Sequence, residues 1–211
     1  MISVNHGMGM PSISILLHEI TKMLFHAEAS AVTYIRVGTS GGIGMEPGTV
    51  VVGTEALSET LEPVYRRLVI GKAVEESTKL DPDLAEFAYR CAQQEPKVPC
   101  VLGKTLGTND FYEGQGRMDG AICSYSEEER REWLLKVKEA GCCNIEMEAP
   151  LFAAFCRRLS IPGLLVCGVL LDRLKGDQVT STHEELQQIS SNAQEVAIRV
   201  MLKRLKAIKA I

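Results

Sequence analysis

Apolar residues near the start of the chain recur at helical spacing and then give way to a strand pattern. Residues 12–29 carry apolar side chains at intervals of three and four with charged residues between them, which predicts an amphipathic helix. Residues 31–37 are rich in β-branched and aromatic side chains, which predicts a buried strand. The glycine-rich residues 38–44 that follow predict a flexible loop after this strand.

The same alternation of patterns continues toward the C-terminus. We expect strands at 49–52, 101–108 and 163–171, and helices at 82–93, 126–138, 146–159 and 182–209. Ser126 with Glu129 and Thr182 with Glu185 have the spacing of a capping box at the start of two of these helices. Alternating helices and apolar strands favour an α/β domain whose substantially parallel sheet is covered by helices on both faces.

Composition narrows the class of protein. The 211 residues, 45% of them hydrophobic, predict one domain over 1–211 with a substantial core. The net charge of -4 offers no general field for nucleic acid or anionic lipid, so we expect neither partner. Seven cysteines without a CxxC pair suggest neither a disulfide framework nor a zinc site. With no apolar run of about 20 residues, we predict a cytoplasmic protein without a membrane span.

The glycine-rich segment after the first predicted strand is the first candidate site. It lacks the P-loop lysine, and its glycine spacing does not match a dinucleotide fingerprint. Its glycines let backbone amides approach an anion, while Arg36 offers a planar donor fork and Thr39 or Ser40 a hydroxyl. The pattern indicates a small-anion site, and a structural ion pair of Arg36 beside a turn is the alternative.

The second candidate site lies in residues 108–117. In an extended loop Gln115 and Arg117 would project to the same side, because side-chain direction alternates along extended backbone. Gln offers a donor and an acceptor, and Arg offers charged donors, which together suit the edge of a planar heterocycle. Phe111 could pack on its face. The alternative is a polar surface turn with Phe111 filling the core.

Two further groups of charged residues stand where predicted elements begin or end. Glu146 and Glu148 open a predicted helix, where acidic residues favour the helix dipole. A carboxylate aimed into a cleft could instead accept hydrogen bonds from sugar hydroxyls, with Met147 supplying an apolar contact. Asp172 and Arg173 follow the apolar strand at 163–171, a position that often lines α/β active sites, although a local turn or surface pair is the alternative.

Taken together and in order, these segments resemble the nucleoside phosphorylase family, and within it the vertebrate-type uridine phosphorylases. The resemblance is carried by residues 6–9, 35–44, 110–121 and 144–148 and spans essentially the whole chain. It implies a three-layer sandwich with a mixed, substantially parallel central sheet flanked by helices.

The resemblance also implies a role for each candidate residue. Arg36 and Thr39 resemble phosphate contacts, Phe111, Gln115, Arg117 and Arg173 the uracil pocket, and Thr39, Met147 and Glu148 the ribose contacts. The implied catalytic residues are Arg36, Gln115 and Arg117. The implied enzyme is a pentosyltransferase of pyrimidine nucleoside salvage, which converts uridine and phosphate reversibly to uracil and ribose 1-phosphate. We expect a homodimer that needs no metal or redox cofactor.

The start of the chain qualifies these expectations. Relatives of this type carry additional N-terminal strands and a glycine-rich loop whose arginine helps to enclose phosphate, so we expect a domain incomplete at its N-terminus. One alternative is a catalytically impaired relative that binds nucleoside or joins a dimer. Another is a phosphorylase of a different nucleoside, because Asp172 lies where purine-specific relatives carry an acid. Gln115 and Arg117 favour a pyrimidine.

Overall fold

The computed structural model describes residues 1–209, in which five strands form one mixed sheet. The strands pair in the order β1 (Tyr34–Gly42), β6 (Cys142–Glu146), β5 (Cys100–Gly107), β2 (Val50–Leu57) and β7 (Gly163–Asp172). Strand β7 also pairs with β1, so the sheet closes into a barrel. Three of the pairings, β1–β7, β2–β5 and β5–β6, are parallel, and β1–β6 and β2–β7 are antiparallel. The predicted α/β fold with a mixed, substantially parallel sheet flanked by helices is confirmed.

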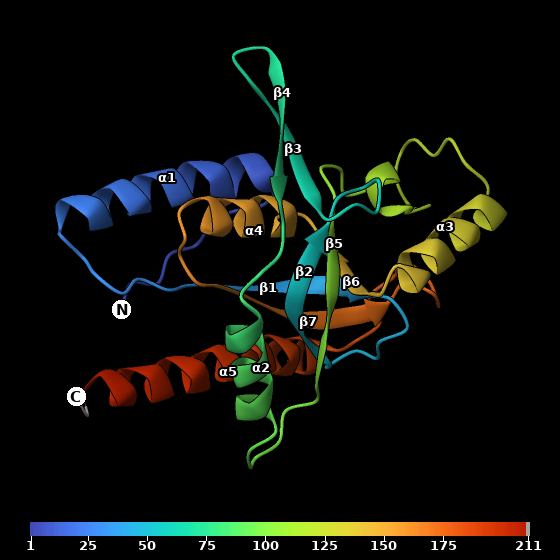
Figure 1. The fold of residues 1–211 in the computed structure, drawn as a ribbon. Coiled ribbons are helices and arrows are strands. Elements are labelled where there is room, and N and C mark those ends of the chain that lie inside the picture. Colours follow the sequence, from blue (N-terminus) through green and yellow to red (C-terminus); the bar gives the residue numbers. More distant parts are fainter. Residues whose placement is uncertain (210–211) are drawn as a thin grey trace.

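Helices cover the sheet from opposite sides (Figure 1). Helices α1 (Met10–His26) and α4 (Ala149–Arg158) lie on one side, α2 (Pro82–Ala92) and α5 (His183–Lys209) on the other, and α3 (Glu127–Glu139) near one end. Leu164 and Val166 of β7 pack in the cluster that includes α2 and α5, whereas Leu165 and Cys167 pack with α1 and α4. Alternate side chains of β7 point to opposite faces of the sheet, and helices cover both faces, so apolar residues occupy the whole strand. Each fully buried Val or Leu contributes about 1.5–3 kcal/mol to the stability of the fold.

Local sequence signals placed most of the elements correctly. The helices predicted at 82–93 and 182–209 and the strands predicted at 101–108 and 163–171 are α2, α5, β5 and β7. Both capping boxes form: the Glu129 amide donates to Ser126 Oγ (3.2 Å), and the Glu185 amide donates to Thr182 Oγ1 (3.2 Å). In each case the glutamate accepts in return from the backbone amide of its capping residue.

The prediction of a loop at 38–44 is wrong for most of that segment, because β1 continues through Gly42. A Cβ atom at Gly41 would lie 2.7 Å from Arg173 Cγ, and one at Gly42 would lie 2.7 Å from Val169 Cγ1. These glycines allow neighbouring side chains to approach the strand closely. The sequence alone suggested the other common use of glycine, a turn.

The helix predicted at 146–159 is also partly wrong, because Glu146 ends strand β6 and α4 begins at Ala149. Asn144, a residue more common in turns, lies fully buried in β6. Its side chain accepts a hydrogen bond from Thr105 Oγ1 (2.8 Å) and donates to Ser40 Oγ (2.9 Å). These contacts with β5 and β1 satisfy the hydrogen-bonding groups of the buried amide. They join residues far apart in the chain, so no local sequence pattern predicts them.

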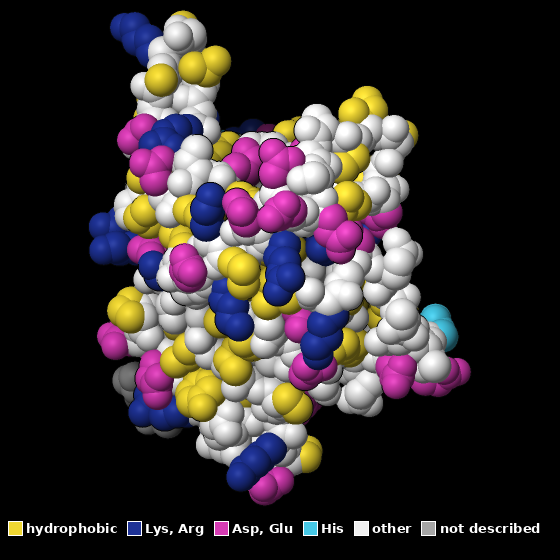
Figure 2. Space-filling model, turned by 90° about the vertical axis from the view of Figure 1, so that its right-hand side faces the viewer, with side chains coloured by type: hydrophobic (Ala, Val, Ile, Leu, Met, Phe, Trp, Pro, Cys, Tyr) yellow, Lys and Arg dark blue, Asp and Glu magenta, His cyan; other side chains and the backbone are white. Residues whose placement is uncertain are grey.

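An unpredicted hairpin of β3 (Val64–Val69) and β4 (Lys72–Ser77) projects from the body (Figures 1 and 2). Positive φ angles at Ile70 (51°) and Gly71 (74°) form its tight turn, and Ile70 is 97% exposed. Figure 2 also shows side chains of both charge signs interspersed over the face that carries α3. Within residues 1–209, no helix is long and apolar enough to cross a membrane.

Candidate active site

Three buried charged residues, which we call the Arg36 cluster, join β1 to the turn between β6 and α4. They are Arg36, Glu146 and Glu148. Arg36 Nη2 lies 2.9 Å from Glu146 Oε2 and also pairs with the Glu148 carboxylate. Arg36 Nη1 donates to Cys167 Sγ at 3.4 Å. The predicted residues Arg36 and Glu148 therefore meet, and Glu146 meets them as well.

Backbone amides hold the two carboxylates in different ways. Glu146 accepts hydrogen bonds from the amides of Glu148 (2.9 Å) and Ala149 (2.8 Å), so its predicted role at the start of the helix is confirmed. Glu148 accepts instead from the amide of Gly9, in the turn before α1. The Glu148 carboxylate thus links Arg36 to the segment that contains residues 6–9.

Burial and charge act on the pKa values of the Arg36 cluster in opposite directions. Burial lowers the pKa of Arg36, but Glu146, Cys167 and Glu148 outweigh it and raise the pKa overall. Burial raises the pKa of Glu146 to about 7, against the opposing effect of Arg36 and with a further rise from Glu148. Arg36 therefore stays charged, and burial makes the Glu146 carboxyl easier to protonate than a carboxyl in solvent.

His6 lies near the Arg36 cluster. In the sequence it is notable only as one of the residues that carry the family resemblance. Burial lowers its pKa, Arg36 lowers it further, and Glu148 acts in the opposite sense. Among the described residues, its buried Nδ1 has no hydrogen-bond partner. A histidine beside glycines was the available signal, but the sequence does not show that it approaches Arg36.

The candidate base-binding segment, residues 109–119, is called the base loop here. The predicted extended conformation is wrong, because Glu113–Gln115 form a 3₁₀ turn and Gly116 has a φ of 62°. The Arg117 guanidinium nevertheless lies over the Phe111 ring, 4.6 Å from its centroid. Phe111 is 43% exposed, so the alternative in which it fills the core is contradicted. Gln115 is buried, and its backbone amide donates to the Tyr112 carbonyl at 3.2 Å.

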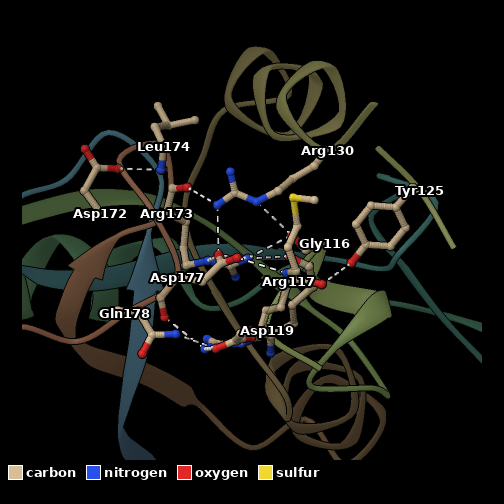
Figure 3. A network of polar contacts seen from close by, with 12 residues as sticks. Gly116, Arg117, Asp119, Tyr125, Arg130, Asp172, Arg173, Leu174, Asp177 and Gln178 are labelled. Atoms are coloured by element: carbon tan, nitrogen blue, oxygen red, sulfur yellow. Dashed lines mark hydrogen bonds and ion pairs between the residues drawn. The ribbon is translucent and has the colours of Figure 1, made fainter. Parts of the chain in front are cut away.

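Arg173 connects the base loop to the end of β7 (Figure 3). It follows β7 directly, is fully buried, and donates from Nη2 to the Gln115 carbonyl at 2.8 Å. Its Nε donates to Asp177 Oδ1 at 3.0 Å. Arg117 pairs with Asp119 at 2.6 Å and donates to the Asp177 carbonyl at 2.9 Å. The structure therefore brings together Phe111, Gln115, Arg117 and Arg173.

Strand β1 runs between the Arg36 cluster and the base loop. Arg36 lies near its start, the Arg173 side chain packs across Gly41 near its end, and Thr39 stands exposed between them. Among the described residues, no hydrogen bond joins Thr39 to the Arg36 cluster. Met147 is half-buried beside Glu148. Arg36 thus lies on β1, and the base loop reaches the other end of this strand through Arg173, which packs on Gly41.

A family model described as the phosphorylase superfamily matches residues 1–206. The chain belongs to the phosphorylase superfamily. Mouse uridine phosphorylase 1 is 45% identical over 204 residues, which are 97% of this chain and 66% of the mouse protein. The chain therefore spans slightly less than two thirds of the length of that curated relative.

Solved structures of phosphorylase superfamily members agree with this membership. A uridine phosphorylase of the oomycete Phytophthora capsici has a TM-score of 0.93 and 49% identity, covering 96% of this chain and 69% of that one. A Schistosoma mansoni uridine phosphorylase in complex with uracil has a TM-score of 0.88 and 37% identity, covering 94% of this chain and 69% of that one. The predicted family resemblance is confirmed.

Proposed function

We propose that this chain is a uridine phosphorylase, a pentosyltransferase that converts uridine and phosphate reversibly to uracil and ribose 1-phosphate. The observation that carries the proposal is the base loop, where Gln115, Arg117 and Phe111 gather beside Arg173. The Arg36 cluster, at the other end of β1, supplies charged groups suited to the sugar and phosphate. The similarity to uridine phosphorylases supports the same reaction.

The chemistry of the base loop suits the edge of uracil. Uracil presents carbonyl acceptors on either side of an N–H donor, and the Gln115 amide offers one donor and one acceptor to match them. Arg117 adds charged donors, and the exposed Phe111 ring offers an apolar face to the base. A purine nucleoside would need a proton donor, yet Asp172 already accepts from the amides of Gly44 (2.9 Å) and Leu174 (3.1 Å).

The Arg36 cluster would bind the sugar and phosphate of the same substrate pair. Glu148 would accept hydrogen bonds from ribose hydroxyls beside Met147, and Arg36 with Thr39 would donate to phosphate. Arg36 already binds Glu146 and Glu148, so phosphate must compete with these carboxylates for the guanidinium donors. Protonation of Glu146 would ease that competition by removing one negative charge.

Bond cleavage places charge where these residues can act on it. As the bond between ribose C1′ and uracil N1 breaks, C1′ gains positive character and the electron pair leaves with uracil. Donors from Gln115 and Arg117 stabilise this developing negative charge more than the neutral base, which lowers the barrier. Phosphate then bonds to C1′ from the opposite side. Phosphate is the co-substrate, and the scheme draws on no metal or redox cofactor.

The direct test is a uridine phosphorolysis assay on the 211-residue chain, with circular dichroism to verify that it is folded. We expect uracil release that depends on added phosphate, with uridine consumed faster than inosine; thymidine serves as a second pyrimidine. Release that is independent of phosphate, or faster inosine turnover, would contradict the proposal. Uridine binding without turnover by the folded chain would favour the nucleoside-binding alternative.

We also propose that the protein acts as a cytoplasmic homodimer in pyrimidine nucleoside salvage. All seven cysteines are free, which supports a reducing compartment. The exposed Leu68 and Ile70 at the tip of the hairpin offer apolar area for contact with a second copy. Light scattering during size-exclusion chromatography tests the dimer, and a mass of one chain at micromolar concentration would contradict it.

A further inference from the structure

Arg130 of α3 is a charged helix residue that turns into the protein. It is only 8% exposed, although the segment around it is strongly charged. Its Nε donates to the Gly116 carbonyl at 3.0 Å, and its Nη2 donates to the Arg173 carbonyl at 2.9 Å and to Asp177 Oδ1 at 2.8 Å. A single guanidinium therefore connects α3, the base loop and the segment after β7 (Figure 3).

Asp177 receives hydrogen bonds from two arginine side chains and from the backbone of the base loop. Its Oδ1 accepts from Arg130 and Arg173, and its Oδ2 accepts from the Met118 amide at 3.0 Å. Burial alone would raise the pKa of Asp177, but the Met118 amide, Arg130 and Arg173 outweigh it and lower the pKa. Asp177 is thus ionised and binds the base loop at the Met118 amide.

The turn at Gly116 also depends on α3. Gly116 has a φ of 62°, and a Cβ atom there would lie 3.0 Å from Cε3 of Trp133. Helix α3 therefore places the Trp133 ring against the turn and the Arg130 donor on its carbonyl. Because Gln115 and Arg117 flank Gly116, these two contacts hold the backbone that connects them.

Three arginines, Arg117, Arg130 and Arg173, meet at this junction around the carboxylates of Asp119 and Asp177. Among the described residues, the buried Nη1 of Arg173 has no hydrogen-bond partner. A departing uracil anion would find a spare donor here.

We propose that Arg130 is a positioning residue for base recognition. Through the Gly116 carbonyl and Asp177, it places Gln115 and Arg117 without touching the base itself. This inference rests on the proposed uridine phosphorylase function. The distinction matters because a displacement of about 1 Å in a recognition group can cost about 100-fold in rate.

The test compares Arg130→Ala and Arg130→Lys with Arg131→Ala, a matched control at the exposed neighbouring position on α3. We expect Arg130→Ala to raise the KM for uridine at least about tenfold while the KM for phosphate stays within about twofold. Arg130→Lys keeps one charged donor and should recover part of the loss. Arg131→Ala should match the unmodified chain in both constants.

An unchanged KM for uridine in Arg130→Ala, or equal rises in both KM values, would overturn the proposal. Amide hydrogen exchange of residues 113–119 supplies a readout that needs no activity, and Arg130→Lys serves there if the alanine variant does not fold. Faster exchange confined to this segment supports the positioning role, and unchanged exchange overturns it. Absence of uridine turnover in the unmodified chain would instead contradict the proposed function, while the exchange result still decides the role of Arg130.

Discussion

The Arg36 cluster and the base loop hold charged groups by different means. In the Arg36 cluster, an arginine on a strand pairs directly with two buried carboxylates beside the core. Around the base loop, Arg130 and Arg173 share the Asp177 carboxylate and also donate to backbone carbonyls, and Arg117 pairs with Asp119 near the surface. The charges of the Arg36 cluster are therefore part of the folded core. The charges around the base loop instead hold a loop that carries the recognition groups.

This difference predicts which property each substitution changes. Removal of one partner from a buried ion pair leaves a charge without compensation, so stability suffers first. Removal of a side chain from a half-exposed loop costs little stability, so binding and catalysis suffer first. Substitutions in the two regions should therefore separate unfolding free energy from uridine turnover.

The largest effect on stability should come from Arg36→Ala. It leaves Glu146 and Glu148 buried without their cation, so we expect the free energy of unfolding to fall by about 3–5 kcal/mol. Urea denaturation measures this loss, with Arg67→Ala in the hairpin as a control expected to cost at most about 1 kcal/mol. A loss below about 1 kcal/mol for Arg36→Ala would contradict the buried pairing.

Arg36→Lys tests the proposed phosphate role with less damage to the fold. Lysine keeps the positive charge but loses the planar fork that binds an oxyanion through two parallel hydrogen bonds. We expect the KM for phosphate to rise while the KM for uridine changes less. Equal phosphate affinity in this variant and the unmodified chain would remove Arg36 from the phosphate site.

The largest effect on turnover should come from Arg117→Ala. Loss of one preorganised donor to the leaving uracil should raise the barrier by about 3 kcal/mol, which lowers kcat for uridine on the order of 100-fold. The free energy of unfolding should change by less than about 1 kcal/mol, because the Asp119 partner lies near the surface. Steady-state kinetics and denaturation are measured on the same preparation, and near-normal turnover would exclude Arg117 from uracil recognition.

A smaller and pH-dependent effect should come from Glu146→Gln. Burial raises the pKa of Glu146 from 4.5 to about 7, so the folded state binds the proton more tightly than the unfolded chain. The resulting contribution to stability is present below about pH 4.5 and is lost as the pH rises to about 7. Between pH 5 and 7.5, the free energy of unfolding of the unmodified chain should fall by on the order of 1–3 kcal/mol through this group. Urea denaturation at the two pH values should not show this fall in Glu146→Gln. Parallel pH profiles for the two proteins would contradict it.

The smallest effect should come from Asp119→Ala. Arg117 would lose its carboxylate partner but keep the Asp177 carbonyl and the Phe111 ring, so its position should change little. We expect the KM for uridine to rise by less than about fivefold, equivalent to about 1 kcal/mol. A rise as large as that caused by Arg130→Ala would show that the ion pair, and not the backbone contacts, positions Arg117.

The sequence by itself determined the elements whose signals are local. Periodic apolar residues marked α1, α2 and α5, apolar runs marked β5 and β7, and capping boxes marked the starts of α3 and α5. The same local chemistry identified Arg36, Gln115, Arg117 and Glu148 as candidates. It missed β6, whose buried Asn144 resembles a turn residue, and it placed Gly41 and Gly42 in a loop.

Only the tertiary structure decided which charged groups meet. Arg130 and Arg131 are identical, adjacent residues on a charged helix, yet Arg130 is buried on the base loop and Arg131 is exposed. Successive residues of a helix point about 100° apart, and packing against distant segments decides which direction faces the interior. The closure of β7 on β1 and the pairing of Arg36 with Glu146 are decided in the same way, by contacts between residues far apart in the chain.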